Sequence, residues 1–398
     1  MAGYIFSVAK EAWNNVIAEN ITYGHFSPYC PEIKEFNDDG KRPTDRQKSA
    51  INKILTATFG DLVTMKEGDN IYFLSDRKIY GVGVTKKIGS DCKYDNYIGA
   101  SAIIPDYEFD VSSATVLTTP SSRARWVCFF EPAKHFFKKG VDMDDVLQFR
   151  PNAFKMLRAF EGLSFIKIDD EENRALREYI CLKNEFAYSN IKSHSFEFDN
   201  SKHKSFVSMN LSPHKMNIIN AMRRNDFSTT IYSEMFVESI LLQYLSEQQE
   251  NPLGKWDYVS HQIIASPFKP LKYIDKIDIF GYRFSGHYNG SPKLITKYLL
   301  VELKKDKINK AALEQTMQYV DWICKEYASG DYSLIEAYVV GSSTVRNINE
   351  DKKEICQRAF ISSSHPATPQ KWNDLHVITY DLSNTCISFS ELNDESCS

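Results

Sequence analysis

The chain has 398 residues, more than one hydrophobic core usually fills, so two domains are expected. A hydrophobic share of 42% and a charged share of 25%, with no low-complexity tract, exclude a fibrous repeat and a disordered chain. The net charge of −4 excludes a uniformly basic surface, so any nucleic-acid partner must be bound by local basic patches.

The sequence shows no feature of a membrane or secreted protein. No apolar run approaches the roughly 20 residues that cross a bilayer, and the start MAGYIFSVAKEAW lacks a basic segment before its apolar residues. We therefore expect a cytoplasmic protein with no membrane partner. The eight cysteines are scattered, without C-x-x-C pairs or cysteine–histidine ligand spacing, so reduced thiols are expected rather than a zinc site.

Residues 1–182 alternate short β-type runs with helices and are predicted to form an α+β accessory domain. A helix is expected over 45–58, followed by the strands NIYFLSD and IYGVGVT, which a tight turn at Arg77 and Lys78 joins. RWVCFFEP and SFIKI are further strands, and a helix with an acidic first turn begins near Asp169. Strands that return at this density predict a small curled sheet or barrel.

Residues 183–230 are polar and weakly patterned, which predicts a linker or connecting module. The pattern sharpens in residues 231–398, which are predicted to form the second domain. It begins with the helix SEMFVESILLQYLSEQ. The next elements are the strands HQIIAS, YIDKIDIFGYRF and KYLLVELKK, the helix INKAALEQTMQYVDWICKEY, the strand LIEAYVVG and finally LHVITYDL. This order predicts an α/β fold with an αβββαβ core, an added strand, and strands buried on both faces.

Two acids on neighbouring strands of this core form a candidate metal site. Asp278 ends the apolar run YIDKID, and Glu302 follows three aliphatic residues inside KYLLVELKK. A carboxylate in so apolar a strand is costly unless a metal, a cation or hydrogen bonds compensate. Hydrolysis of a phosphodiester needs a metal ion, and Mg²⁺ prefers oxygen ligands of this kind.

Three further residues add to this pair. Lys304 shares a strand face with Glu302, because strand side chains alternate, and its ammonium could orient water and stabilise a charged transition state. On the following helix, Gln315 and Tyr319 stand four residues apart and share a face. Leu313, Met317, Val320 and Cys324 form a separate apolar stripe, which predicts the core face of that helix.

The ordered motifs IDIF, LLVELKKDK and EQTMQYVDW resemble the PD-(D/E)XK nucleases of the RecB-like branch, and the mismatch endonuclease group EndoMS in particular. The resemblance covers roughly residues 233–382. It implies Mg²⁺ or Mn²⁺ binding by Asp278 and Glu302, catalysis by Lys304, and support from Gln315 and Tyr319. The family also places an acid on the preceding helix, and spacing does not choose between Glu234 and Glu238.

The polar loop over 283–297 is longer than this resemblance would lead us to expect, which bears on substrate geometry. His287 in that loop and His261 in the preceding strand are interpreted as ordinary polar residues rather than catalytic ones. Between 269 and 310, ten lysines and arginines stand against four acids. This excess predicts a DNA-binding patch that includes Lys305, Lys307 and Lys310.

The segments GDNIYFLSDRKIYGVGVTKK and RWVCFFEPAKHFF resemble, more faintly, the PUA-like barrels, including the EVE type, that hold a nucleobase in an aromatic pocket. That resemblance makes Trp126 a candidate base reader, although aromatic residues on strands more often belong to a core. A reader joined to a cutter is similar in architecture to restriction enzymes that act on modified DNA and to Shedu-type defence nucleases.

Taken together, these motifs predict a Mg²⁺-dependent DNA endonuclease in prokaryotic antiphage defence or restriction. A repair nuclease for mismatched or branched DNA is the main alternative. A non-catalytic nucleic-acid-binding protein on the same fold is less favoured, because folding alone does not require an acid and a lysine on that buried strand. One catalytic site per chain favours a homo-oligomer, either a dimer or a tetramer.

Overall fold

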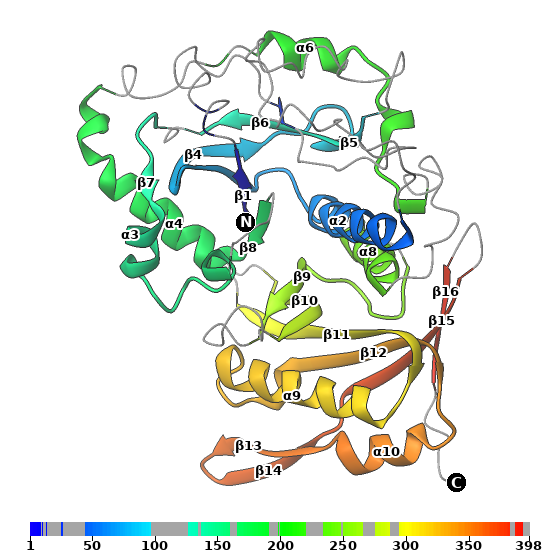
Figure 1. Ribbon diagram of the computed structural model, residues 1–398. Coiled ribbons are helices and arrows are strands. Elements are labelled where there is room, and N and C mark those ends of the chain that lie inside the picture. Colours follow the sequence, from blue (N-terminus) through cyan, green and yellow to red (C-terminus); the bar gives the residue numbers. More distant parts are fainter. Residues whose placement is uncertain are drawn as a thin grey trace. The chain divides into compact units, whose positions relative to one another are not determined.

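A computed structural model describes residues 1–8, 10, 13, 25–26, 44–96, 126–133, 137–159, 165–190, 198, 200–219, 234–247, 250–265, 275–286, 294–382 and 387–392. The chain divides into two compact units, Met1–Asp226 and Phe227–Ser398 (Figure 1). The described residues form a mixed α/β structure, as expected. None of the helices in these ranges is both long and apolar enough to cross a membrane. His287, a sequence candidate, lies outside the described residues.

The first unit is built on a mixed sheet with the strand order β2-β6-β4-β3-β1-β8, in which β5 also pairs with β6 and β7 with β4. The strands are β1 (Gly3–Ser7), β2 (His25–Phe26), β3 (Asn70–Ser75), β4 (Lys78–Thr85), β5 (Lys93–Asp95), β6 (Trp126–Pro132), β7 (Val141–Asp142) and β8 (Phe165–Ile168). Its described helices include α2 (Asp45–Val63), α3 (Met143–Phe149) and α4 (Asp170–Lys183). Strand β1 pairs parallel with β3 and antiparallel with β8, so the start of the chain is a buried interior strand.

Helix α2 begins where the sequence predicts but extends to Val63 rather than 58. Its first turn is closed by a capping box, in which the Thr44 side chain accepts from Gln47 N and the Gln47 side chain accepts from Thr44 N. The helix continues because Phe59 and Leu62 are fully buried, so packing holds the last turn in place.

The polar stretch expected as a linker belongs to the first unit where it is described. It contains the short helices η4 (Glu185–Asn190), α6 (Ser201–Val207) and η5 (Ser212–His214). Phe206 and Leu211 are buried in one cluster with Tyr94, Val127 and Phe129. Buried apolar residues within a polar stretch therefore pack it against the sheet.

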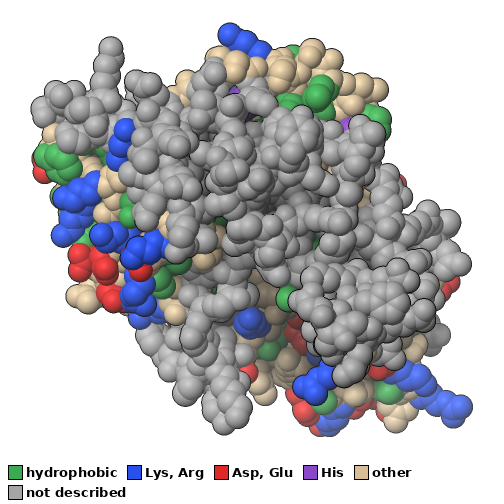
Figure 2. Space-filling model, turned by 45° about the horizontal axis from the view of Figure 1, so that its top comes forward, with side chains coloured by type: hydrophobic (Ala, Val, Ile, Leu, Met, Phe, Trp, Pro, Cys, Tyr) green, Lys and Arg blue, Asp and Glu red, His purple; other side chains and the backbone are tan. Residues whose placement is uncertain are grey.

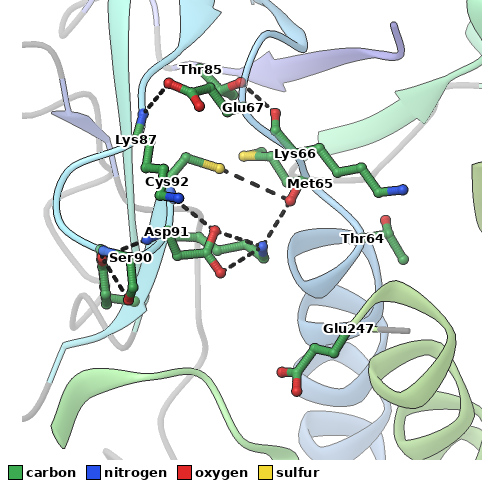
Figure 3. A network of polar contacts seen from close by, with 12 residues as sticks. Thr64, Met65, Lys66, Glu67, Thr85, Lys87, Ser90, Asp91, Cys92 and Glu247 are labelled. Atoms are coloured by element: carbon green, nitrogen blue, oxygen red, sulfur yellow. Dashed lines mark hydrogen bonds and ion pairs between the residues drawn. The ribbon is translucent and has the colours of Figure 1, made fainter. Parts of the chain in front are cut away.

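A buried polar network closes the turn after α2, and the carbonyl oxygen of Met65 is its hub (Figure 3). Lys93 Nζ donates to Met65 O at 2.8 Å and is paired with Asp91 Oδ1 at 2.9 Å. The neighbouring thiol, Cys92, is buried, and this burial raises its pKa to about 12. A thiol held protonated is a poor nucleophile, so Cys92 is a packing residue here.

The loop before β8 is held by a buried carboxyl group on α4. Glu172 Oε1 accepts hydrogen bonds from three successive backbone amides, Lys155 N at 2.7 Å, Met156 N at 2.9 Å and Leu157 N at 3.2 Å. We expect Glu172→Ala to lower the free energy of unfolding by about 3 kcal/mol, because these amides lose their acceptor. Urea unfolding of the full chain measures this loss, and Glu171→Ala on the exposed face of the same turn is the matched control.

The same carboxyl group predicts a pH dependence of stability. Burial, and then the charge of Asp169, raise the pKa of Glu172 from 4.5 to about 8. Between these two values the folded state keeps a proton that the unfolded chain releases, so the contribution of Glu172 to stability is greatest below pH 4.5 and declines as the pH rises towards 8. Glu172→Gln should flatten this slope while keeping an oxygen acceptor. An unchanged slope would show that Glu172 is ionised throughout.

The second unit is a six-stranded sheet with the order β16-β15-β12-β11-β10-β9. Its sheet strands are β9 (Tyr258–Ile264), β10 (Lys276–Phe284), β11 (Ile295–Ile308), β12 (Ile335–Thr344), β15 (Leu375–Leu382) and β16 (Ile387–Glu391). The main helices are α8 (Glu234–Ser246) and α9 (Lys310–Glu326). The order from α8 to β12 is α-β-β-β-α-β, which matches the order expected from the sequence.

Strand β11 occupies the centre of this sheet, antiparallel to β10 and parallel to β12. Helix α9 lies along β11 and β12 (Figure 1). The apolar stripe predicted on α9 is confirmed, because all four of its residues are buried: Leu313, Met317, Val320 and Cys324. Between β12 and β15 the chain adds helix α10 (Ile348–Ile355) and the hairpin β13 (Arg358–Ser364) to β14 (Ala367–Trp372), which the sequence reading did not anticipate.

Candidate active site

The candidate site forms where β11 leaves the core of the second unit. Residues 298–303 of this strand are all buried, whereas Lys304 is half-buried and Lys305 is exposed. Glu302 is the one charged residue in that buried run and is 2% exposed. The apolar run makes β11 a central strand, and that position carries the Glu302 carboxyl group out of water.

Asp278 lies beside Glu302 on the neighbouring strand. Ile279 pairs with Val301 across the antiparallel strands β10 and β11, so Asp278, one residue before Ile279, lies opposite Glu302, one residue after Val301. Asp278 Oδ2 accepts from Leu303 N at 2.8 Å, which ties the side chain to β11. Burial, and then the charges of Glu302 and Glu238, raise the pKa of Asp278 well above its ordinary value.

Lys304 connects the acid on β11 to the following helix. Its Nζ donates to Glu302 Oε1 at 2.5 Å and to Gln315 Oε1 at 3.2 Å. Gln315 Nε2 in turn donates to the Tyr319 hydroxyl at 3.1 Å. The structure therefore brings together all four residues in one chain of hydrogen bonds from β11 to α9. Asp278 stands at its buried end.

The protonation states within this chain follow from its contacts. Burial raises the pKa of Glu302, and the hydrogen bond from Lys304 opposes that rise. For Lys304, burial would lower the pKa, but the bond to Glu302 outweighs it and the pKa is raised. Burial also raises the pKa of Tyr319 to about 12. Lys304 is thus a cation and Tyr319 a neutral phenol at neutral pH.

The two acids on α8 that spacing left open differ in their contacts. Glu238 is 2% exposed, and its two carboxyl oxygens are contacted from β9, Oε1 by His261 Nδ1 at 2.7 Å and Oε2 by Gln262 Nε2 at 3.4 Å. Glu234, one turn earlier, is half-buried and accepts from Lys305 N at 3.2 Å. Among the charges acting on Asp278, that of Glu238 exceeds that of Glu234.

Gln262 is a site residue that sequence reasoning missed. Besides contacting Glu238, its Nε2 donates to Asp278 Oδ1 at 3.2 Å. The residue has a left-handed backbone, with φ of 52°, where ordinary strand residues are extended. The available signal was the pair of polar residues, His261 and Gln262, inside a strand that is otherwise mostly apolar. His261, interpreted as an ordinary polar residue, is buried against Glu238.

A β-bulge shapes the exit of β11. Lys304 pairs with Gly341 but Lys307 pairs with Ser343, so β11 carries one extra residue between them. The bulge is held at both backbone groups of Lys305, whose N–H donates to Glu234 and whose carbonyl accepts from the Tyr380 hydroxyl at 2.9 Å. Glu234 therefore has a structural contact, as the acceptor for the backbone N–H of Lys305 in the bulge.

The close approach at the bulge also explains a glycine. A Cβ at Gly341 would lie 2.6 Å from Ile308 Cγ1 and 2.9 Å from the Asp306 carbonyl oxygen. Any larger residue would push the two strands apart beside Lys304. The bulge therefore depends on glycine at position 341.

The lysines predicted to bind DNA are exposed where β11 ends and α9 begins: Lys305, Lys307 and Lys310. Lys310 is within 3.5 Å of Glu354, a surface pair that contributes little to stability. Figure 2 shows one face of the molecule, on which the described Lys and Arg side chains are interspersed with Asp and Glu.

The acids of the site come from α8, β10 and β11, and carboxylate oxygens are ligands that divalent cations such as Mg²⁺ prefer. Glu302 Oε2 is buried and has no hydrogen-bond partner among the described residues, an oxygen that a cation would satisfy. No group of three acidic, histidine or cysteine side chains within the described ranges is already arranged as a ligand set. Lys304 Nζ and Gln262 Nε2 instead contact the carboxylates.

In the first unit, Trp126 is 3% exposed and packs edge-on against Phe59, with ring centroids 5.9 Å apart. That environment is typical of a core residue. Its role as a base reader stays a prediction.

No protein-family model matches this sequence, and no curated protein matches it either.

The contacts of Gln315 predict a moderate effect of removing its amide. In Gln315→Leu, Lys304 loses an acceptor and Tyr319 loses a donor, so Lys304 is less firmly oriented. In an assay of the DNA cleavage that the sequence motifs predict, we expect Gln315→Leu to be slower than wild type by about 10-fold, as for other residues that orient catalytic groups. Gln318→Leu, on the exposed face of the same helix, is the matched control and should cleave at the wild-type rate.

Proposed function

We propose that the second unit is a metal-dependent nuclease domain of the PD-(D/E)XK type that hydrolyses phosphodiester bonds of DNA. The observation that carries the proposal is the contact chain Glu302–Lys304–Gln315, with Asp278 beside it. A buried carboxyl group in an aliphatic strand is costly to the fold, and Lys304 contacts only one oxygen of Glu302, which leaves Oε2 without a hydrogen-bond partner among the described residues. The α-β-β-β-α-β order of the elements supports the same assignment.

The acids that would hold Mg²⁺ or Mn²⁺ are Asp278, Glu302 and Glu238. We assign Glu238 rather than Glu234 as the acid from the first helix, because Glu238 is buried and contacts the Gln262 side chain, which also contacts Asp278. A bound cation supplies charge neutralisation at the phosphate and a more acidic water molecule. Glu234 is assigned to the β11 bulge through Lys305 N.

Lys304 is assigned to electrostatic stabilisation rather than proton abstraction. The hydrogen bond to Glu302 raises the pKa of Lys304 and keeps its amine protonated. A protonated amine has no lone pair with which to act as a base. A fixed ammonium donates to a phosphoryl oxygen as negative charge develops there. Gln315 orients this ammonium, and Tyr319 fixes the Gln315 amide by accepting from its Nε2.

We place this activity in prokaryotic antiphage defence or restriction, with the first unit selecting the DNA. Closed circular duplex DNA incubated with the full chain tests the activity. Nicked and linear products are expected with Mg²⁺ or Mn²⁺ and not with EDTA. Intact DNA under both metals, with the protein shown to be folded, would falsify the proposal. Branched or mismatched oligonucleotides cut faster than matched duplex would move the assignment to repair.

A further inference from the structure

The side chain of Gln262 lies between two carboxyl groups of the candidate site. Its Nε2 is 3.4 Å from Glu238 Oε2 on α8 and 3.2 Å from Asp278 Oδ1 on β10. An amide nitrogen carries the positive end of its dipole, so it holds two negative groups together, as a cation would, but more weakly. One neutral donor thus contacts two of the acids that the proposed function assigns to a metal.

The backbone of β9 is shaped to place this amide there. His261 pairs with Ile279 and Ile263 pairs with Ile277, so Gln262 lies between two registered pairs, opposite Asp278. In a regular strand His261 and Gln262 would point to opposite faces. The left-handed φ of 52° at Gln262 breaks that alternation, and both side chains reach Glu238. Such a conformation costs on the order of 1 kcal/mol, so contacts of Gln262 must compensate.

A glutamine amide offers two different atoms at the same end. A half-turn about its last side-chain bond exchanges the Nε2 donor for the Oε1 acceptor without moving the backbone. Carbonyl oxygens of Asn and Gln are ordinary ligands of Mg²⁺ and related cations. The buried Oε2 of Glu302, without a hydrogen-bond partner among the described residues, shows independently that the cluster presents an unsatisfied anionic oxygen.

We propose that Gln262 is a ligand of the divalent cation. Its amide bridges Glu238 and Asp278 in the protein alone and turns to present Oε1 when the cation binds between them. The inference rests on the proposed function, because it assumes that these acids bind metal. The inference goes beyond the proposed function because it adds a fourth, neutral side chain from β9 to the site. It also adds a change in the conformation of that side chain when the cation binds.

The alternative role for Gln262 is that of a spacer, and the two roles predict opposite results. If the amide only separates the carboxylates, its removal exposes each carboxylate to the negative charge of the other. A cation that neutralises both charges then binds more tightly. If the amide is a ligand, its removal weakens binding. We expect Gln262→Leu to weaken Mn²⁺ binding by about 10-fold, as measured by isothermal titration calorimetry on the full chain without DNA.

Two further variants keep the test decisive if the leucine variant folds poorly. Gln262→Asn favours a left-handed backbone but is one methylene shorter, so it should fold and also bind Mn²⁺ more weakly. Gln262→Glu keeps the reach, supplies a charged oxygen and should bind more tightly than wild type. Gln357→Leu removes an exposed glutamine amide outside the site and should leave Mn²⁺ affinity unchanged.

The outcomes separate this inference from the proposed function. Unchanged or tighter Mn²⁺ binding by the leucine and asparagine variants, with wild type binding metal and cutting DNA, would overturn the role of Gln262 alone. A wild-type protein that binds no divalent cation would overturn both the ligand assignment and the metal dependence. Weaker binding by both variants, with tighter binding by Gln262→Glu, would support the inference.

Discussion

Glu302→Gln is expected to lower the rate of DNA cleavage by about 10³-fold or more. The substitution keeps the size of the side chain and removes only the charge, and a metal ion contributes several kcal/mol of transition-state stabilisation that depends on its ligands. The effect should lie in the rate constant of cleavage, because the exposed lysines at the β11–α9 junction are untouched. Single-turnover kinetics measure the rate constant of cleavage, and a separate DNA-binding measurement shows whether the affinity for DNA has changed.

The fold should survive this substitution. Burial raises the pKa of Glu302, so the ionised carboxyl group destabilises the folded protein in the absence of metal. A neutral amide removes that penalty, and the thermal midpoint of Glu302→Gln without metal should equal or exceed that of wild type. A much lower midpoint would mean that Glu302 is a structural residue, and lost cleavage would then carry no information on catalysis.

Lys304→Met is the second substitution with a large expected effect. Methionine matches much of the length of the lysine stem but supplies no cation, so the transition-state charge loses a fixed donor. Removal of one such donor typically lowers the rate by about 10²- to 10³-fold. Mn²⁺ binding should be retained, because Lys304 is not among the proposed ligands. Calorimetry and single-turnover cleavage on the same preparation measure the two properties.

Lys325→Met is the matched control, since Lys325 is exposed in the last turn of α9. It should cleave at the wild-type rate. If Lys304→Met also cleaves at that rate, the assignment of Lys304 to catalysis is wrong. If it instead loses Mn²⁺ binding, the lysine acts by holding Glu302 in place through their 2.5 Å contact.

The sequence predicted those parts of the site that depend on periodicity. The aliphatic residues before Glu302 predicted a strand buried on both faces, and period-two alternation placed Lys304 on the same side as Glu302, where the two side chains are in contact. Helical spacing placed Gln315 and Tyr319 together and gave the apolar stripe of α9. These are local rules, and the packing of the second unit does not override them.

The residues that the sequence did not reveal depend on departures from those rules. The position of Gln262 follows from one left-handed backbone angle, which no spacing pattern encodes. The contact of Glu234 with Lys305 follows from a one-residue bulge. The choice between Glu234 and Glu238 needed the positions of β9 and β10, because both acids lie on the same helix one turn apart.

In the first unit, tertiary packing overrode composition. The stretch after α4 is polar enough to predict a linker, yet Phe206 and Leu211 bury their side chains against the sheet. The strand at the start of the chain is interior because β3 and β8 pair on either side of it. Such long-range pairing is set by partners distant in sequence.

Metal-dependent cleavage by wild type beside Glu302→Gln tests the central claim most directly. Closed circular DNA is incubated with each purified protein at matched concentration, with Mg²⁺, with Mn²⁺ and with EDTA. We predict that wild type cuts only with a metal and that the folded variant leaves the DNA intact under all three conditions. Equal cutting by both proteins, or cutting by wild type in EDTA, would contradict the assignment of Glu302 to a metal-dependent nuclease site.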